Sequence, residues 1–346
     1  MRLDVIIPTY NRHQLLRRIL SSLLAAESPL GLDVRVTVVD NNSRDETRSV
    51  VESHKERFQG RLNYVFESKQ GRSHALNAGI MSTGGELVGM IDDDEEIDKE
   101  WYASIYSAFT EYNIDFIGGP YVPQWGAERP EWLPSGYLGA IGWVDGGQEI
   151  VPFDKSYPGI LMGGNAVLTR AILNKVGLYK TSLGRTDKRL ISGEDDDMYQ
   201  RLLAAGAHGY YIPDLIIYHF IPPERLTRTY FRRWCFWRGI SCSLIDRERP
   251  MPVAYLGRVP RYLYGQLARG MVNVIIGLLG RRKSASQVFT DELALWDAAG
   301  FIYGRHFYKP SSSVEPDGPS RQKLQGGTLP SFREHHAQQT YSRLLE

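Results

Sequence analysis

The chain has 346 residues, of which 42% are hydrophobic and 23% charged, and its formal net charge is +1. These values are ordinary for a globular protein of one large or two smaller domains, and they exclude a function based on overall charge, such as general nucleic-acid binding. Two cysteines, Cys235 and Cys242, are too few for a disulfide framework, which fits a reducing compartment.

The first half of the chain alternates predicted strands with predicted helices. Apolar and β-branched runs predict strands over residues 3–7, 34–39, 62–66, 86–91 and 116–118. Helices are predicted after Asn11 as cap, after a capping box at residues 43–46, over 71–81 and near 99–112. Because the strands are apolar throughout, we predict a mostly parallel sheet covered by helices on both faces.

Polar residues follow three of these strands. They occupy residues 9–12, residues 40–43 and the acidic triplet Asp92, Asp93 and Asp94. In parallel sheets, ligands bind outside the carboxyl ends of the strands, so we expect one site built from all three clusters.

Two acidic runs are candidates for chemistry. The first, Asp92 to Asp94, is either a cation site or a solvated turn; along an extended backbone Asp92 and Asp94 would share one side and could meet one metal ion. The second, Glu194 to Asp197, begins a predicted helix. It supplies either ordinary N-terminal charges or a general base for an attacking hydroxyl.

Seven segments in this order resemble the inverting glycosyltransferases of family 2: VIIPTYNR, VVDNNSRDET, QGRSHALNAGI, IDDDEEID, GGNAVLTR, GEDDDMYQRLLAAG and IYHF. The resemblance covers residues 3 to about 239. It implies the α/β GT-A fold, a Rossmann-like and mostly parallel sheet with helices on both faces. It also implies metal-dependent, inverting transfer of a sugar from a nucleotide-diphosphate sugar to an acceptor hydroxyl, in bacterial polysaccharide or glycolipid assembly.

The same resemblance implies a role for individual residues. Asp195 would be the general base, with Glu194 beside it in the catalytic motif, and Asp92, Asp94 and His219 would hold Mg²⁺ or Mn²⁺. The implied donor-binding residues are Pro8, Thr9, Tyr10, Arg12, Asp40, Asn42, Lys69, Gly71, Asn77, Asp92 and Asp93, where Lys69 replaces the asparagine of many relatives. The acceptor side would comprise Gly163, Gly164 and Asn165, and Trp143 is a further candidate because aromatic rings stack on sugars.

The rest of the chain differs in character. We predict a GT-A domain over residues 1–220, a basic and aromatic helical region over 221–305, and a disordered tail over 306–346 that is rich in Ser, Pro, Gly and Gln. Between His219 and Lys283 there are 13 Lys and Arg but three acids, a local net charge of +10. Such a region could lie in a membrane interface, which would suit a lipid-linked acceptor, or pack on the sheet domain with its arginines snorkelling.

The expected location is the cytoplasm, with attachment to the inner face of the cytoplasmic membrane left open. We expect no signal peptide, because the first apolar run ends at Pro8, and no membrane-spanning helix, because no run of about 18 apolar residues occurs. A nucleic-acid partner is not expected, since no recognised motif accompanies the basic segment.

Two other functions fit part of the pattern. A nucleotidyltransferase would share the frame and the acidic metal site, but the segment PTYNRHQ lacks the Gly-rich, basic loop that would bind a triphosphate. A non-catalytic binding module would use the basic helices alone.

Overall fold

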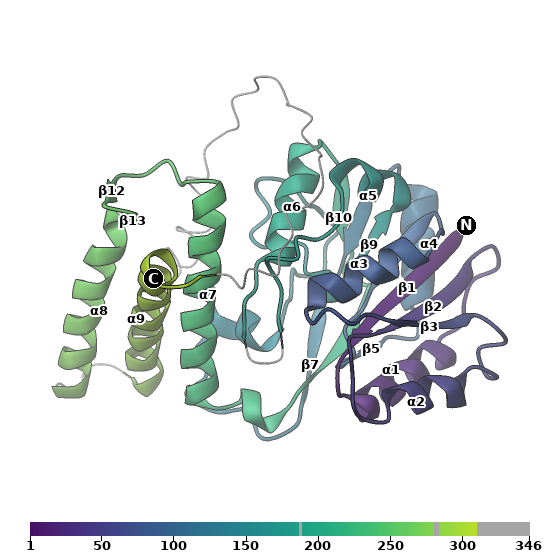
Figure 1. Ribbon diagram of the computed structural model, residues 1–346, viewed down its shortest axis with the longest axis horizontal. Coiled ribbons are helices and arrows are strands. Elements are labelled where there is room, and N and C mark those ends of the chain that lie inside the picture. Colours follow the sequence, from purple (N-terminus) through teal and green to yellow (C-terminus); the bar gives the residue numbers. More distant parts are fainter. Residues whose placement is uncertain (187–188, 280–283, 310–346) are drawn as a thin grey trace.

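The computed structural model describes residues 1–186, 189–279 and 284–309. Of the tail predicted over residues 306–346, residues 310–346 lie outside the described residues. An α/β domain occupies the first two thirds of the chain, and three long helices stand beside it (Figure 1).

The core of the α/β domain is an eight-stranded sheet with the order β3-β2-β1-β4-β9-β6-β10-β8. Its strands are β1 (Arg2–Thr9), β2 (Asp33–Asp40), β3 (Leu62–Phe66), β4 (Leu87–Met90), β6 (Phe116–Gly118), β8 (Val151–Pro152), β9 (Ala166–Thr169) and β10 (Gly209–Tyr211). Strand β9 runs antiparallel to β4 and β6, and β8 runs antiparallel to β10, whereas the other pairs are parallel. The prediction of a mostly parallel sheet is confirmed.

Helices cover both faces of this sheet, as its apolar strands require. One face packs against α1 (His13–Ala25), α2 (Thr47–His54) and α4 (Trp101–Glu111), and the other against α3 (Arg72–Ser82), α5 (Arg170–Val176) and α6 (Glu194–Ala204). Alternation along β1 sends Leu3, Val5 and Ile7 to the first core and Ile6 to the second.

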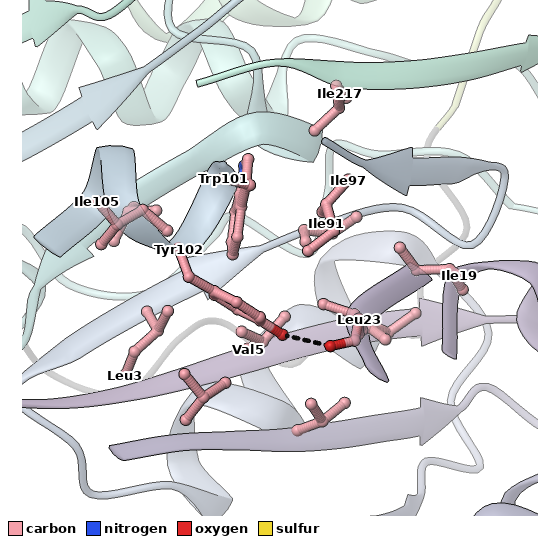
Figure 2. Packing of buried hydrophobic residues seen from close by; sticks show 14 of the residues in the cluster. Leu3, Val5, Ile19, Leu23, Ile91, Ile97, Trp101, Tyr102, Ile105 and Ile217 are labelled. Carbon is pink, nitrogen blue, oxygen red and sulfur yellow. Dashed lines mark hydrogen bonds between the residues drawn. The ribbon is translucent and has the colours of Figure 1, made fainter. Parts of the chain in front are cut away.

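The first of these cores fixes α4 against α1. Figure 2 shows Trp101 and Tyr102 of α4 among aliphatic side chains of β1 and α1. The hydroxyl of Tyr102 donates a hydrogen bond of 3.3 Å to the carbonyl oxygen of Leu23. Trp101 is fully buried, and the same core holds Ile91 and Ile97, which lie before and after the acidic triplet in the chain.

Both predicted helix caps are wrong, because the loops after β1 and β2 lie side by side and exchange their hydrogen bonds. Asn11 adopts a left-handed φ of 52° and does not cap α1; the carboxylate of Asp45 instead accepts a bond of 3.0 Å from the amide of His13. The predicted box at residues 43–46 is absent, since α2 begins at Thr47 with no cap bond from Glu46. Asp45 therefore serves the first turn of both helices.

The segment from 121 to 165 contains short elements. These are β7 (Tyr121–Trp125), the 3-10 helix η1 (Ser135–Ile141), β8 and the 3-10 turn η2 (Gly163–Asn165). Strand β7 joins β5 (Glu95–Ile97) and β11 (Ile217–Ile221) in a second sheet of order β5-β11-β7. This small sheet holds the chain that follows the acidic triplet beside His219.

The C-terminal region is helical as predicted, with a small hairpin inside it. After the 3-10 turn η3 (Pro223–Arg225) come α7 (Arg228–Glu248), β12 (Tyr255–Leu256), β13 (Val259–Pro260), α8 (Arg261–Leu279) and α9 (Ala285–His306). Helices α7 and α9 approach closely, since a Cβ at Gly239 or Gly300 would collide with the backbone of the other helix. None of the helices in the described part of the chain combines the length and the apolar character that a membrane span needs.

Candidate functional site

A cavity of about 1200 Å³ opens at the carboxyl ends of β1 and β4. One wall comes from the loop after β1, including Pro8, Thr9, Tyr10 and Arg12, and another from Asp92, Asp93, Asp94 and Glu95. The N-terminus of α6 and the inner sides of α7, α8 and α9 close the remainder. All three predicted strand-end clusters, the second of them through Asn41 alone, and the second acidic run therefore border one space.

Arg72, the first residue of α3, joins the two acidic runs. Its Nε donates to Oδ1 of Asp92 at 2.9 Å, and its Nη1 lies 3.1 Å from Oδ1 of Asp195 and 3.3 Å from Oε1 of Glu194. Burial lowers the pKa of Arg72, but the three carboxylates outweigh that effect and hold the pKa well above the ordinary arginine value. A fixed positive charge thus lets acids a hundred residues apart in the chain lie together.

Asp93 and Asp94 are buried and neutralised by two other arginines. Arg12 donates to Oδ1 of Asp93 at 2.8 Å and to Oδ2 of Asp94 at 3.0 Å, while Thr9 donates to the second oxygen of Asp93. Arg225 donates to Oδ2 of Asp94 at 2.9 Å. Burial raises the pKa of Asp93 to about 6; for Asp94 burial acts in the same direction, but Arg225 and its neighbours hold the pKa well below the ordinary value.

Asp92, Asp94 and Glu95 offer oxygen atoms that all lie within 4.8 Å of one another. Oxygen ligands around one Mg²⁺ or Mn²⁺ lie about 4 Å apart at most, so a small inward movement of these carboxylates would let all three contact one ion. Carboxylates are also the ligands that such hard ions prefer. Burial and the two neighbouring carboxylates raise the pKa of Glu95 well above its usual value. The donor set therefore fits a divalent cation, whose charge would favour the ionised form of Glu95.

Glu194 and Asp195 begin α6 after Gly193, which has a left-handed φ of 104°. The N-terminus of a helix favours negative charge, which lowers the cost of placing two acids here. Burial raises the pKa of Glu194 to about 7, and the charge of Asp195 adds to this effect. Asp195 is more exposed to the cavity, with a side-chain exposure of 17% against 7% for Glu194.

The turn Gly163-Gly164 brings two carboxylates close to the backbone. A Cβ built on Gly163 would overlap Oδ1 of Asp195, and one built on Gly164 would overlap Oε1 of Glu95. The sequence pattern assigned this turn to the acceptor side. In the structure its absence of side chains makes room for Asp195 and Glu95, and Gly164 also lines the cavity.

Three residues assigned to ligand binding instead hold the structure together. Asn165 is fully buried: its Oδ1 accepts from Trp101 at 3.0 Å and its Nδ2 donates to the carbonyl oxygens of Pro120 and Leu215. Asn77 exchanges two hydrogen bonds with the backbone of Tyr179. These bonds use the amide groups that a ligand would need.

The third is Trp143, which lies outside the cavity wall. Its ring packs edge-to-face on Trp125 with centroids 5.8 Å apart, and the guanidinium of Arg129 stands 5.1 Å from its centroid. These contacts occupy the ring that was assigned to sugar stacking.

The loops after β2 and β3 place their predicted donor residues beside the cavity rather than in its wall. Asp40 accepts from the amide of Ser43 and the hydroxyl of Tyr64 at 2.8 and 2.7 Å. Asn42, exposed Lys69 and Gly71 flank Asn41 and Gln70, and it is these last two that line the cavity. Base contacts by Asp40, Asn42, Lys69 and Gly71 remain predictions.

His219 on β11 lies in the cavity wall near the acidic triplet. Its Nε2 is 3.2 Å from Nη1 of Arg225 and 3.7 Å from Oδ1 of Asp94. No protein atom in the described part of the chain bonds to its buried Nδ1. His219 does not share the close oxygen cluster of Asp92, Asp94 and Glu95, and its role as metal ligand stays a prediction.

Sequence reasoning assigned neither a counter-charge role to Arg72 and Arg225 nor a ligand role to Glu95. Arg72 and Glu95 stand inside quoted motifs, and each could have been found by asking which positive charge or further ligand the Asp triplet requires. Arg225 follows His219 by six residues but gives no local signal, because its partner Asp94 is 131 residues away.

Comparisons with known proteins agree with this geometry. A family model described as "Glycosyl transferase family 2" matches residues 4–177, which is half of the chain. The succinoglycan biosynthesis protein ExoM of Rhizobium meliloti is 24% identical over 257 residues, 72% of this chain and 76% of that protein. The glucosyl-dolichyl phosphate glucuronosyltransferase of Haloferax volcanii is 25% identical over 258 residues, 72% of this chain and 79% of that protein.

Among solved structures, the mannosyltransferase PcManGT of Pyrobaculum calidifontis, in complex with GDP-Man and Mn²⁺, has a TM-score of 0.57 at 18% identity. The alignment covers 88% of this chain and 86% of that chain. Residues 1–349 of Staphylococcus aureus TarS with UDP give a TM-score of 0.50 at 18% identity, covering 88% and 90%. These likenesses show a shared GT-A fold.

Proposed function

The chain belongs to glycosyltransferase family 2 and is a glycosyltransferase with the GT-A fold, and from this premise we propose its reaction. It transfers a sugar from a nucleotide-diphosphate sugar to an acceptor hydroxyl, with inversion at the anomeric carbon and with dependence on Mg²⁺ or Mn²⁺. The observation that carries the proposal is the meeting of Asp92 and Asp195 on one guanidinium at the cavity wall.

Asp195 acts as the general base. Its Oδ1 is held by Arg72, which leaves Oδ2 to accept the proton of the acceptor hydroxyl. As that proton moves, the hydroxyl oxygen bonds to the anomeric carbon and the bond from this carbon to the diphosphate oxygen breaks on the opposite face. One base on the attacking side is all that a single inverting displacement needs.

The donor is held at the strand ends. Pro8, Thr9, Tyr10 and Arg12 form the wall beside which base and ribose bind, and Asp93 is oriented by Thr9 and Arg12. A divalent cation held by Asp92, Asp94 and Glu95 would neutralise the charge of the diphosphate leaving group.

The acceptor enters from the side of the C-terminal helices. That wall of the cavity combines apolar residues, among them Ile245, Met251, Leu263 and Phe301, with polar and charged ones such as Arg238, Asp246 and Arg249. Relatives are named for succinoglycan biosynthesis and for transfer to a dolichyl phosphate and an undecaprenol carrier. These observations support a saccharide or lipid-linked acceptor in polysaccharide or glycolipid assembly, and a lipid-linked acceptor would place the enzyme at the inner face of the cytoplasmic membrane.

A thermal-shift screen of nucleotide sugars, with and without Mn²⁺, tests donor binding, because a ligand of the folded state raises its apparent stability. Product analysis with the donor found then separates the rivals. Release of nucleoside diphosphate supports transfer to sugar acceptors, whereas release of pyrophosphate would indicate a nucleotidyltransferase. A chain that binds no donor in any condition would fit a non-catalytic module.

A further inference from the structure

Helix α8 turns an apolar face away from the rest of the molecule. It packs on α9 through Leu263 and Gly270, and it stands at the outer edge of the chain, away from the sheet domain (Figure 1). Its outward face carries Tyr264, Ala268, Met271, Val272, Ile275 and Ile276. The last four are each 51% to 54% exposed, and no acidic residue occurs anywhere in the helix.

Two arginines border this apolar face and share a hollow. Arg261, Gly265 and Arg269 follow one another at four-residue spacing, so they lie on one side of α8. With Tyr262, Val253 and Ala254 they line a depression of about 430 Å³. Among the residues that the structure describes, neither guanidinium has an ion-pair or hydrogen-bond partner.

The charge pattern distinguishes between possible occupants of this surface. Residues 219–283 carry a net charge of +10, whereas the remainder of the chain carries −9. A second copy of the chain would bring the same uncompensated arginines against this face. An anionic bilayer offers phosphates to the arginines and hydrocarbon to the isoleucines, with tyrosine at the headgroup level.

We propose that α8 docks on an anionic lipid bilayer, with a lipid phosphate in the hollow between Arg261 and Arg269 and the side chains of Met271, Val272, Ile275 and Ile276 in the acyl boundary. The inference rests on the peripheral location put forward above, but on no step of the transfer reaction. The opposite side of α8, with Leu263 and Gln266, lines the main cavity. Docking would therefore bring the acceptor wall of the cavity next to the membrane.

The first test is flotation of the full chain with phosphatidylcholine vesicles that contain or lack phosphatidylglycerol. Each arginine near an anionic surface strengthens binding about fivefold, so R261Q/R269Q should lose about thirtyfold in affinity for the anionic vesicles. The matched control is R17Q/R57Q, which removes two exposed arginines from the α1–α2 end of the molecule. The control should bind like the wild type.

A second measurement reports which face meets the lipid. In a C242S background, a polarity-sensitive fluorophore on M271C should shift to the blue with anionic vesicles, while the same label on L30C, at a site 98% exposed, should not. Vesicle binding requires neither donor nor turnover. The docking proposal can therefore fail while the transferase proposal stands, and the transferase proposal can fail while docking is observed.

Several results would overturn the inference. They are absence of binding by the full chain, equal binding by R261Q/R269Q and wild type, and a blue shift that appears without vesicles because α8 pairs with a second copy. Displacement by inorganic phosphate but not by sodium chloride of equal ionic strength would assign the hollow to free phosphate instead. Binding lost in R261Q/R269Q and the shift at residue 271 together support it.

Discussion

Nη1 of Arg72 lies 3.1 Å from Oδ1 of Asp195, and through Nε the same guanidinium contacts Asp92. A residue of the donor-side helix α3 thereby sets the position of the proposed base on α6. The carboxylate of Asp195 is fixed on one oxygen and available on the other.

Replacement of Asp195 by asparagine should abolish most turnover while it preserves donor binding. The amide has the same shape but cannot take a proton, so we expect turnover to fall about 10²- to 10⁴-fold. Nucleoside diphosphate release measures turnover, and calorimetric titration with the donor measures binding. D214N, a change at an exposed carboxylate, is the control; an active D195N enzyme would remove Asp195 from the mechanism.

Arg72→Met should destabilise the folded chain, and Mn²⁺ should reverse part of the loss. Without the guanidinium, Asp92, Glu194 and Asp195 lose a shared buried counter-charge, which costs about 3–5 kcal/mol in comparable networks. Urea unfolding in chelator and in Mn²⁺ gives the two free energies. R17M at an exposed site is the control, and equal stability of R72M and wild type in chelator would show that the acids need no cation.

Gly163→Ala should lower turnover while the chain still folds. The added methyl would collide with Asp195 and shift its carboxylate, and a displacement of about 1 Å can lower turnover about 100-fold. G84A, where a Cβ meets nothing within 4 Å, controls for the backbone effect of the same change. If turnover of G163A matches that of G84A, the turn does not position the base.

The sequence predicts those parts of the site that follow from the order of strands and polar clusters along the chain. Apolar runs that end in polar clusters indicate parallel strands, and parallel strands bring Thr9 and Asp93 to one edge without further information. Contacts made across the chain escape this reasoning. The need of the Asp triplet for a positive charge points to Arg72, but its contact with Glu194 spans 122 residues, and nothing near either residue identifies the other as its partner.

The direction in which a side chain points is a second property that the sequence does not predict. The resemblance assigned residues 163–165 to the acceptor side, but the Gly-Gly-Asn pattern could not tell whether Asn165 faces the cavity or the interior. The answer depends on Trp101 and Leu215, which come from other elements and offer the amide its partners.

Asn165→Ala should therefore reduce stability rather than acceptor affinity. The change leaves the indole N–H of Trp101 and the carbonyl of Leu215 without their partner, whereas the carbonyl of Pro120 still accepts from the amide of Ile217. One unsatisfied buried group costs about 1–3 kcal/mol. Denaturant unfolding should show a loss of about 3 kcal/mol, against almost none for exposed N63A. A raised acceptor KM at unchanged stability would return Asn165 to the acceptor site.

Asp45 should stabilise the fold in a pH-dependent manner. Partial burial raises its pKa, but hydrogen bonds from Thr47 and His13 outweigh burial and lower the pKa to about 2. A carboxylate with a depressed pKa contributes its full stabilisation above its unfolded value near 4, and loses it as the pH falls toward 2. Asp45→Ala removes the bonds to the first turns of α1 and α2, which should cost about 1 kcal/mol at neutral pH.

Urea unfolding of wild type and D45A from pH 7 downward measures this difference. The difference in unfolding free energy between wild type and D45A should stay constant down to about pH 4 and become smaller below it. Protonation of Asp45 in the wild type then weakens the same hydrogen bonds that the substitution removes. Glu46→Ala is the matched control, since Glu46 precedes α2 but makes no cap bond, and it should leave stability nearly unchanged. If E46A proves the more destabilising, the capping box read from the sequence would be restored and the exchange between the β1 and β2 loops refuted.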